Sequence, residues 1–463
     1  MEVKQVVVVV VIKQEYRSYV AHCIGSLLMV FLFFINERTT AQENPDNPSY
    51  ETYKKRVLET TEIDFLSSYY SQEGTNAAVT GGIGTEDLQD ATAAVVIKIP
   101  LNEDDLLTID AGISAYTSAS SSNVDPFDGE NSADAFVATS GASRQDAWTN
   151  FTARYTHSSD SRNDVVSAAL SVSTEYDYFS LGFGATYSKL FHEKNTEFSV
   201  NANAFLDTWK LIYPSELRPF GPTGNARSNN LFVGNTITGN PNYNPLFSPL
   251  KNSNRNSYAL GVTLSQIISK NIQGSFLVDF VKQDGLLSTP FQRVYFRDIE
   301  DSFIQNFHLA EGIEKLPNTR FKLAFGGRLH YYINETFVLR TYYRYYTDDW
   351  NIKSHTASLE VPIKVSDKFT LYPSYRFYNQ TAANAFAAYN QHLSSEEFFT
   401  SDYDLSNYTA NQFGFGITYT NILADLHIWK LGLKSIDLKY NLYQRDSGLN
   451  AGIVSLGFNF IAD

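Results

Sequence analysis

Residues 335–347 read ETFVLRTYYRYYT. Along this stretch the odd-numbered positions are mainly apolar or aromatic, and the even-numbered positions include both arginines. Phe337 and Tyr343 fall on one face of this stretch, whereas Arg340 and Arg344 fall on the other. A period of two is the period of a β-strand. An arginine facing hydrocarbon at the middle of a bilayer would cost about 2–4 kcal/mol, so the arginine face must line an interior. The stretch therefore predicts a strand with an apolar outer face and a polar inner face.

The same alternation recurs along the chain in segments of roughly 11 to 14 residues. A soluble β-sandwich would alternate as well, but it would have no reason to place its long loops on one side. We expect about 16 strands, an even number typical of outer-membrane barrels. The expected strands are residues 59–72, 88–100, 105–117, 148–158, 164–176, 178–190, 196–209, 255–268, 272–283, 319–332, 335–347, 351–364, 369–381, 408–421, 433–445 and 448–461.

The connections between these segments fall into two classes. With the N-terminus in the periplasm, one side receives tight polar turns such as Asn102-Glu103-Asp104. Short periplasmic turns and long external loops are the pattern of outer-membrane barrels. The sequence therefore predicts an all-β, transmembrane, antiparallel up-and-down barrel. The other side receives long segments rich in Gly, Asn, Pro and Ser, with short connections near Asp177, Asp348 and Asp446: residues 73–87, 118–147, 210–254, 284–318 and 382–407.

One segment does not fit this pattern. Residues 422–432 (ILADLHIWKLG) are too long and too apolar for a usual periplasmic turn. The segment is either an interfacial hairpin or a sign that the strand register is wrong there.

Composition excludes several other classes of protein. The 463 residues carry a net charge of -14 and no clustered basic run, which disfavours a nucleic-acid partner. The single cysteine, Cys23, excludes a disulfide framework and thiolate metal sites. Beyond residue 36 no apolar run approaches the roughly 20 residues that a membrane-spanning helix needs.

The N-terminal region predicts export. Residues 19–36 are apolar and precede a small-residue site ending at Ala41, the pattern of a secretory signal, with a retained helical anchor as the alternative. The expected domains are a signal peptide at 1–41, a periplasmic tail at 42–57 and a barrel at 58–463. The expected location is the outer membrane of a Gram-negative bacterium. Outer-membrane lipids and the barrel assembly machinery, signalled by Phe458 and Phe460 near the end of the chain, are the expected partners.

Two groups of residues are candidates for function. The first is a basic cluster on the inner face, which either selects and orients solutes or only pairs with acids such as Asp279 and Glu360. The second lies in loop 284–318, which either folds inward as a constriction or docks a partner. The basic cluster is Lys322, Arg328, His330, Arg340, Arg344 and Arg376; the loop residues are Pro290, Phe291, Arg293, Tyr295, Phe296 and Arg297.

Signals of catalysis are weak. The histidines fall in separate segments without the spacing of metal ligands or of a catalytic triad. His355, near Asp348 and Asp349, forms the best pair available. We therefore expect no enzyme activity, no metal and no cofactor.

Several exact stretches resemble the family called domain of unknown function 3570, whose members are envelope proteins of Gram-negative bacteria. The longest are Gln283–Phe291 (QDGLLSTPF) and Tyr342–Trp350 (YYRYYTDDW), and the likeness spans nearly the whole mature chain. The resemblance implies gene neighbours that include a flavin transferase and a small lipoprotein, and it carries no catalytic residues. Shorter stretches with the same likeness are Thr80–Glu86, Tyr116–Ser120, Arg293–Phe296, Leu316–Arg320 and Thr400–Ser406.

These features predict a channel or conduit that houses or docks a flavinylated or redox-active lipoprotein in extracytoplasmic electron transfer. A passive solute porin and a plugged barrel that binds partners through its external loops are the alternatives.

Overall fold

The computed structural model describes residues 56–118, 145–220, 232 and 235–462. The predicted signal segment 1–41, most of the tail 42–57 and most of loop 118–147 lie outside the described residues. Among the residues that are described, no helix is long and apolar enough to cross a membrane.

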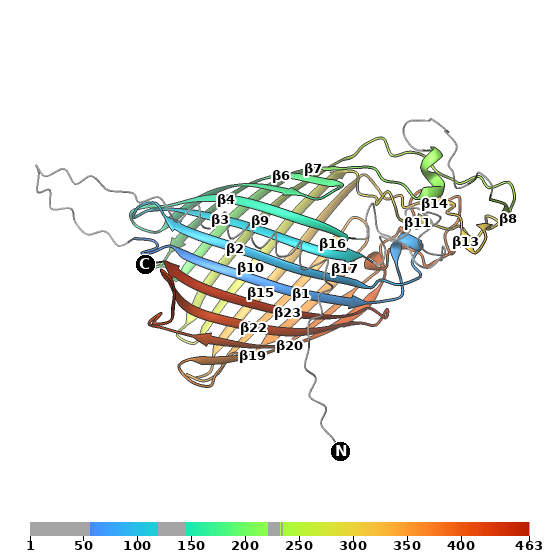
Figure 1. The fold of residues 1–463 in the computed structure, drawn as a ribbon. Helices are drawn as coiled ribbons and strands as arrows, with labels where there is room; N and C mark the ends of the chain where they lie inside the picture. Colours follow the sequence, from blue (N-terminus) through green and yellow to red (C-terminus); the bar gives the residue numbers. More distant parts are fainter. Residues whose placement is uncertain (1–55, 119–144, 221–231, 233–234, 463) are drawn as a thin grey trace, which may run out of the picture. The chain divides into compact units, whose positions relative to one another are not determined.

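The chain forms a closed antiparallel barrel of 16 strands, as predicted. Each strand pairs with the next barrel strand in the chain, and β1 pairs with β23 to close the wall (Figure 1). The strands are β1 (Glu62–Glu73), β2 (Leu88–Pro100), β3 (Asp105–Ser118), β4 (Gln145–Ser158), β5 (Asp164–Thr174), β6 (Tyr178–Phe191), β7 (Thr196–Trp209), β9 (Asn254–Ser269), β10 (Ile272–Gly285), β15 (Thr319–Tyr332), β16 (Val338–Asp348), β17 (Lys353–Glu360) with its continuation β18 (Ile363–Lys364), β19 (Phe369–Gln380), β20 (Tyr408–Thr420), β22 (Leu431–Arg445) and β23 (Asn450–Ala462).

Two strand boundaries differ from the expected ones for local reasons. β16 begins at Val338 rather than at residue 335, because the Asn334 side chain accepts hydrogen bonds from the backbone N–H groups of Thr336 and Phe337 and holds a turn. The expected strand 351–364 is divided into β17 and β18 around Pro362, since proline has no N–H group to give to the sheet.

The strand register keeps the inner and outer faces continuous from one strand to the next. Tyr343 lies opposite Gly327 and Ala357, whereas Arg344 lies opposite Gly326 and Thr356. Large apolar side chains remain exposed on the outward face, and in the described chain nothing covers them. Such a surface would be unstable in water and matches the lipid-facing band of a transmembrane barrel. Examples of these side chains, by exposed fraction, are Phe183 43%, Leu260 44%, Phe276 53% and Phe413 53%.

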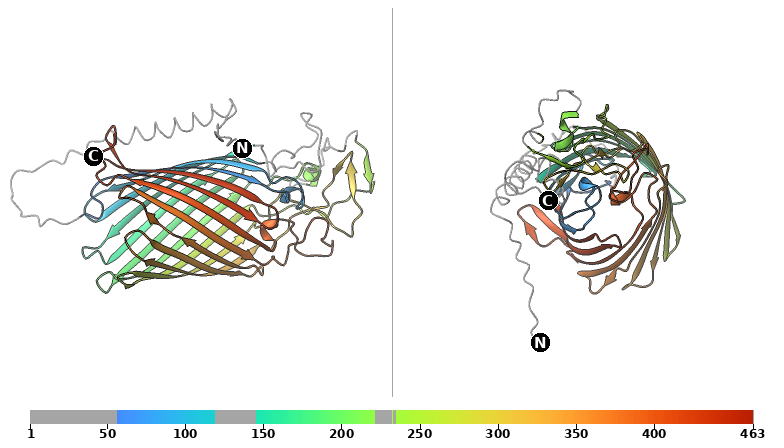
Figure 2. Two further views of the ribbon diagram at one scale, coloured as in Figure 1. Left: turned by 90° about the horizontal axis from the view of Figure 1, so that it is seen from below. Right: turned by 90° about the vertical axis from the view of Figure 1, so that its right-hand side faces the viewer.

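The fully buried side chains gather at one end of the barrel, where external loops fold together. We call this body the mouth cap; it comprises the described parts of 74–87, 210–253, 286–318 and 381–407. Figure 2 shows that some of its segments lie within the ring of strands. Its short elements are η1 (Ala78–Thr80), η3 (Ser215–Phe220), β8 (Ile237–Gly239), β11 (Arg293–Val294), β12 (Ser302–Ile304), β13 (Phe307–His308), β14 (Gly312–Ile313) and η4 (Tyr403–Leu405).

The anomalous segment 422–432 is a hairpin at the opposite end of the barrel from the cap. β21 (His427–Ile428) pairs with the first residues of β22, and the register of β22 against β23 shifts between Leu433 and Ser435. Leu423 and Trp429 at this hairpin are 78% and 72% exposed. The segment is therefore a hairpin, and a local irregularity of the strand register follows it.

Candidate functional site

The basic cluster forms one patch on the inner wall. Lys322, Arg328 and His330 lie on β15, where His330 is opposite Arg340 of β16. Arg376 lies on β19, which is separated from β16 by the single strand β17. The patch therefore extends over the four strands β15, β16, β17 and β19. The strand register places the patch on the same face of the wall as Tyr70 and Tyr443, which line a cavity beneath the cap. The side chains of the patch therefore point into the barrel.

Part of this patch is paired with acids. Arg340 Nη1 lies 2.9 Å from Glu360 Oε1, and Arg344 Nη2 lies 3.5 Å from Asp279 Oδ2. Both arginine side chains nevertheless remain accessible, at 45% and 40% of their surface. Both arginines are thus only partly covered by their acidic partners.

The remaining cations of the patch are held differently. The Arg328 guanidinium lies 5.5 Å from the centre of the Tyr342 ring. Arg376 lines a cavity of about 270 Å³ on the inner wall, together with Glu360 and Lys439. Within the described residues no acid lies within ion-pair distance, 4.0 Å, of Arg328 or Arg376. A role in selecting solutes stays a prediction.

Across β6, β7 and β9, glycines of the inner face lie beside asparagines of the neighbouring strand. A Cβ at Gly184 would lie 2.9 Å from Asn203 Oδ1, and one at Gly261 would lie 2.6 Å from Asn201 Nδ2. Because these glycines have no side chain, the amide groups of Asn203 and Asn201 occupy the space above them. The inner wall therefore combines the basic patch with a stretch of glycine and asparagine, which also carries Asp207 opposite Arg255.

The mouth cap is joined by a buried ion pair between two loops. Arg293 Nε donates to Glu216 Oε1 over 2.7 Å, and Nη2 donates to Oε2 over 3.2 Å. The two side chains are 2% and 0% exposed. Arg293 also donates to the carbonyl oxygen of Val79, and Ala310 N donates to Glu216. One ion pair thus connects segments 74–87, 210–253 and 286–318.

The other predicted loop residues also belong to the cap. Pro290, Tyr295 and Phe296 are buried, whereas Arg297 is exposed. The Phe291 ring packs edge-on against Trp209 at 6.0 Å. Whether the loop restricts passage or docks a partner stays a prediction.

Two carboxyl groups, the buried Glu314 and the half-buried Asp402, join segment 286–318 to segment 381–407. Glu314 accepts hydrogen bonds from Thr289 N over 2.6 Å and from Thr400 Oγ1 over 2.5 Å. Asp402 accepts one from Gln292 Nε2 over 3.3 Å. Burial raises the pKa of Glu314 to about 8 and the pKa of Asp402 to about 6.

We expect the cap to loosen as pH rises. Because both pKa values lie above those of the unfolded chain, the folded cap binds these protons more tightly. Its stability is greatest below the ordinary carboxyl pKa and falls as pH rises through about 6 and then about 8. Hydrogen exchange of amides in 286–318 and 381–407, divided by the intrinsic rate, should be faster at about pH 8.5 than at about pH 5.5.

The variant carrying Glu314→Gln and Asp402→Asn is the matched control, since its side chains stay neutral at both pH values. Its exchange ratio between the two pH values should be closer to one than that of the native protein. An equal ratio in the native protein and in this variant would show that these carboxyls do not govern the cap.

A cavity of about 480 Å³ lies between the cap and the barrel wall. Tyr70 of β1 and Tyr443 of β22 line it from the wall, and Gln292 lines it from the cap. Arg445 of the wall holds the cap across this space, with its Nη1 2.8 Å from Asp404 Oδ1.

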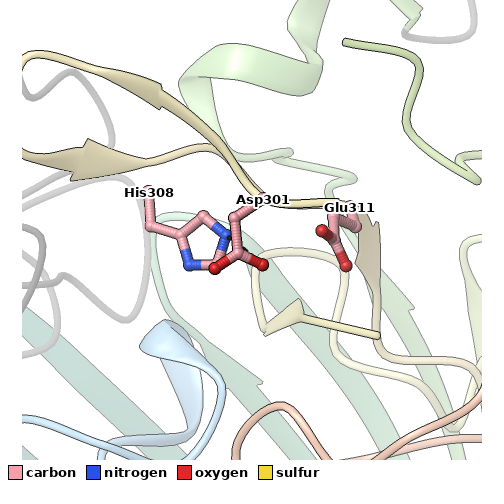
Figure 3. A group of neighbouring side chains, drawn as sticks. All are labelled: Asp301, His308 and Glu311. Carbon is pink, nitrogen blue, oxygen red and sulfur yellow. Dashed lines mark ion pairs between the residues drawn. The ribbon is translucent and has the colours of Figure 1, made fainter. Parts of the chain in front are cut away.

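The histidines are arranged differently from the pair that the sequence favours. His355 Nδ1 lies 2.7 Å from Tyr343 Oη on the outer face, whereas Asp348 accepts hydrogen bonds from Arg320. His308 instead lies close to two acids of its own loop (Figure 3). These are Asp301 and Glu311, which cannot be picked out from the sequence because an irregular loop gives no characteristic ligand spacing.

The comparisons with known proteins give a family match and remote structural likeness. The model of a family described as "Protein of unknown function (DUF3570)" matches residues 51–452. No curated protein matches the sequence.

Three solved structures are similar over most of their length. A bacterial polysaccharide outer membrane secretin has 8% identity and a TM-score of 0.42, covering 87% of this chain and 99% of its own. A BenF-like porin from Pseudomonas fluorescens Pf-5 has 7% identity and a TM-score of 0.39, with coverage of 87% and 99%. The outer membrane protein opdK from Pseudomonas aeruginosa has 6% identity and a TM-score of 0.38, with coverage of 87% and 99%.

Proposed function

The chain belongs to the DUF3570 family of proteins of unknown function, and we propose from its geometry that it is an outer-membrane channel for small, water-soluble solutes. The basic inner wall favours anions, and the mouth cap restricts entry from outside the cell. The family supplies no activity to transfer, so the proposal depends on the lumen and the cap.

The observation that carries this proposal is the accessible charge at the inner wall. Arg340 and Arg344 stay 45% and 40% accessible although each has an acidic partner. A barrel of 16 strands is wide enough for an aqueous channel unless its loops fill it. Fixed charges along such a channel attract ions of opposite sign.

The proposed location is the outer membrane of a Gram-negative bacterium. The apolar outer face supports contact with outer-membrane lipids. Phe458 and Phe460, on either side of Asn459 near the end of β23, support delivery by the barrel assembly machinery. The channel carries out no catalytic step.

Purified protein in planar bilayers should conduct ions, because the lumen is hydrated. We expect brief or small openings in the native protein and a moderate preference for anions. A conductance that stays at the level of protein-free bilayers, both in the native protein and after removal of cap contacts, would contradict the channel. It would leave the plugged barrel that binds partners through its external loops.

A second candidate function is docking of a flavinylated or redox-active lipoprotein. In the described part of the chain, the end opposite the cap carries short turns and the hairpin with exposed Leu423 and Trp429. A hollow lumen that opens toward the periplasm could receive such a partner. Purification of the tagged barrel from its native envelope should then recover a flavin-containing lipoprotein, and its consistent absence would contradict docking.

A further inference from the structure

Three potential metal ligands meet in the outer part of the mouth cap. Asp301 precedes β12, His308 ends β13, and Glu311 follows shortly after. One ligand atom of each lies within 4.8 Å of the others. Figure 3 shows the Asp301 carboxylate between the His308 ring and the Glu311 carboxylate.

Two of the ligand atoms are buried without a hydrogen-bond partner. His308 and Glu311 are only 5% and 2% exposed. Within the described residues, His308 Nε2 and Glu311 Oε1 have no hydrogen-bond partner. Native proteins satisfy nearly all buried polar atoms, and an isolated buried carboxylate is especially costly. These two atoms point to a ligand that both can contact.

The other polar atom of each side chain is already engaged. His308 Nδ1 lies 2.7 Å from Tyr389 Oη, and Phe296 N donates to Glu311 Oε2 over 2.5 Å. When His308 Nδ1 donates its hydrogen to Tyr389 Oη, the lone pair of the neutral imidazole lies on Nε2. Partners at the second atom of each ligand are typical of metal sites.

Aromatic neighbours hold the imidazole ring in place. The His308 ring stacks on Tyr295 at 4.2 Å and on Phe303 at 4.7 Å between ring centres. The ligand atom therefore has a defined direction before any ion binds. Such preorganisation lowers the entropy cost of binding.

The distances suit a small divalent ion. His308 Nε2 lies 3.6 Å from Asp301 Oδ1. Donors at about 2.1 Å from a tetrahedral zinc ion lie about 3.4 Å apart, so these atoms need to move little. The Asp301 side chain is 42% exposed, which leaves access for the ion and for a water ligand.

We propose that Asp301, His308 and Glu311 bind one divalent transition-metal ion of the zinc class. Two carboxylates balance the charge of the ion, and the imidazole favours zinc-like ions over Ca²⁺ and Mg²⁺. The bound ion joins β12 and β13 to the segment that follows them, and through Tyr389 it reaches segment 381–407.

Zinc binding to the full-length protein, purified in detergent without a polyhistidine tag and stripped with a chelator, tests the site. Equilibrium dialysis followed by metal analysis should give one Zn²⁺ per native chain. His308→Asn and Glu311→Gln should each weaken binding by at least about tenfold. Preserved heat-modifiable migration on gels shows that the variant barrels remain folded.

His392→Asn is the matched control. His392 is also a buried cap histidine, but its Nδ1 lies 2.6 Å from Glu396 and its Nε2 lies 3.0 Å from the carbonyl oxygen of Thr400. This variant should bind Zn²⁺ like the native protein. Failure of the native protein to bind Zn²⁺, equal binding by the His308 and Glu311 variants, or tighter binding of Ca²⁺ than of Zn²⁺ would overturn the proposal.

Discussion

Replacing Arg293 by methionine is expected to open the mouth cap and raise the conductance of the barrel several-fold. The substitution leaves Glu216, which is 0% exposed, without its charged partner. Breaking a buried pair in this way typically costs about 3–5 kcal/mol. That cost falls on the cap rather than on the barrel, because Arg293 holds segments 74–87 and 210–253 to segment 286–318. Single-channel recordings and limited proteolysis of the external loops would measure the effect.

The double variant Glu216→Leu with Arg293→Met provides the control. Removing both charges avoids the uncompensated carboxylate, and such replacements are often neutral or stabilising. This variant should therefore be closer to the native protein in conductance and in protease resistance. If Arg293→Met alone is as closed and as resistant as the native protein, the ion pair does not hold the cap.

Changing Arg340 and Arg344 together to serine is expected to shift ion selectivity strongly toward cations. The substitution removes two positive charges and leaves Glu360 and Asp279 unpaired in the lumen. Because these sites are accessible to water, the change acts on the field along the channel more than on folding. Reversal potentials across a salt gradient would measure the shift.

The complementary variant, Glu360→Gln with Asp279→Asn, removes the acidic partners and keeps the arginines. It should shift selectivity toward anions, opposite to the arginine variant. Unchanged reversal potentials in both variants would place these side chains away from the path of the ions.

The barrel could be predicted from the sequence because hydrocarbon imposes the same rule on every strand. Arg340 and Arg344 could be assigned to the lumen since a lipid-facing arginine is costly. Their partners could not be identified, because β15 separates Asp279 on β10 from Arg344 on β16, and only the folded register brings the two together.

The mouth cap could not be predicted in the same way. Glu216 and Arg293 are 77 positions apart in segments without periodicity, so their pairing follows from tertiary packing alone. The same holds for Asp301, His308 and Glu311, whose loop has no regular spacing.

The central claim is that the barrel encloses a water-filled lumen, and two neighbouring cysteine variants test it most directly. The natural cysteine, Cys23, lies in the predicted signal segment, so Asn203→Cys on the inner face and Ala202→Cys on the outer face of β7 would each supply a single thiol in the mature chain. In lipid vesicles, a charged methanethiosulfonate reagent should modify the inner cysteine rapidly and reduce conductance, while the outer cysteine stays unmodified. Equal protection of both cysteines would contradict a hydrated lumen and, with it, the proposed channel.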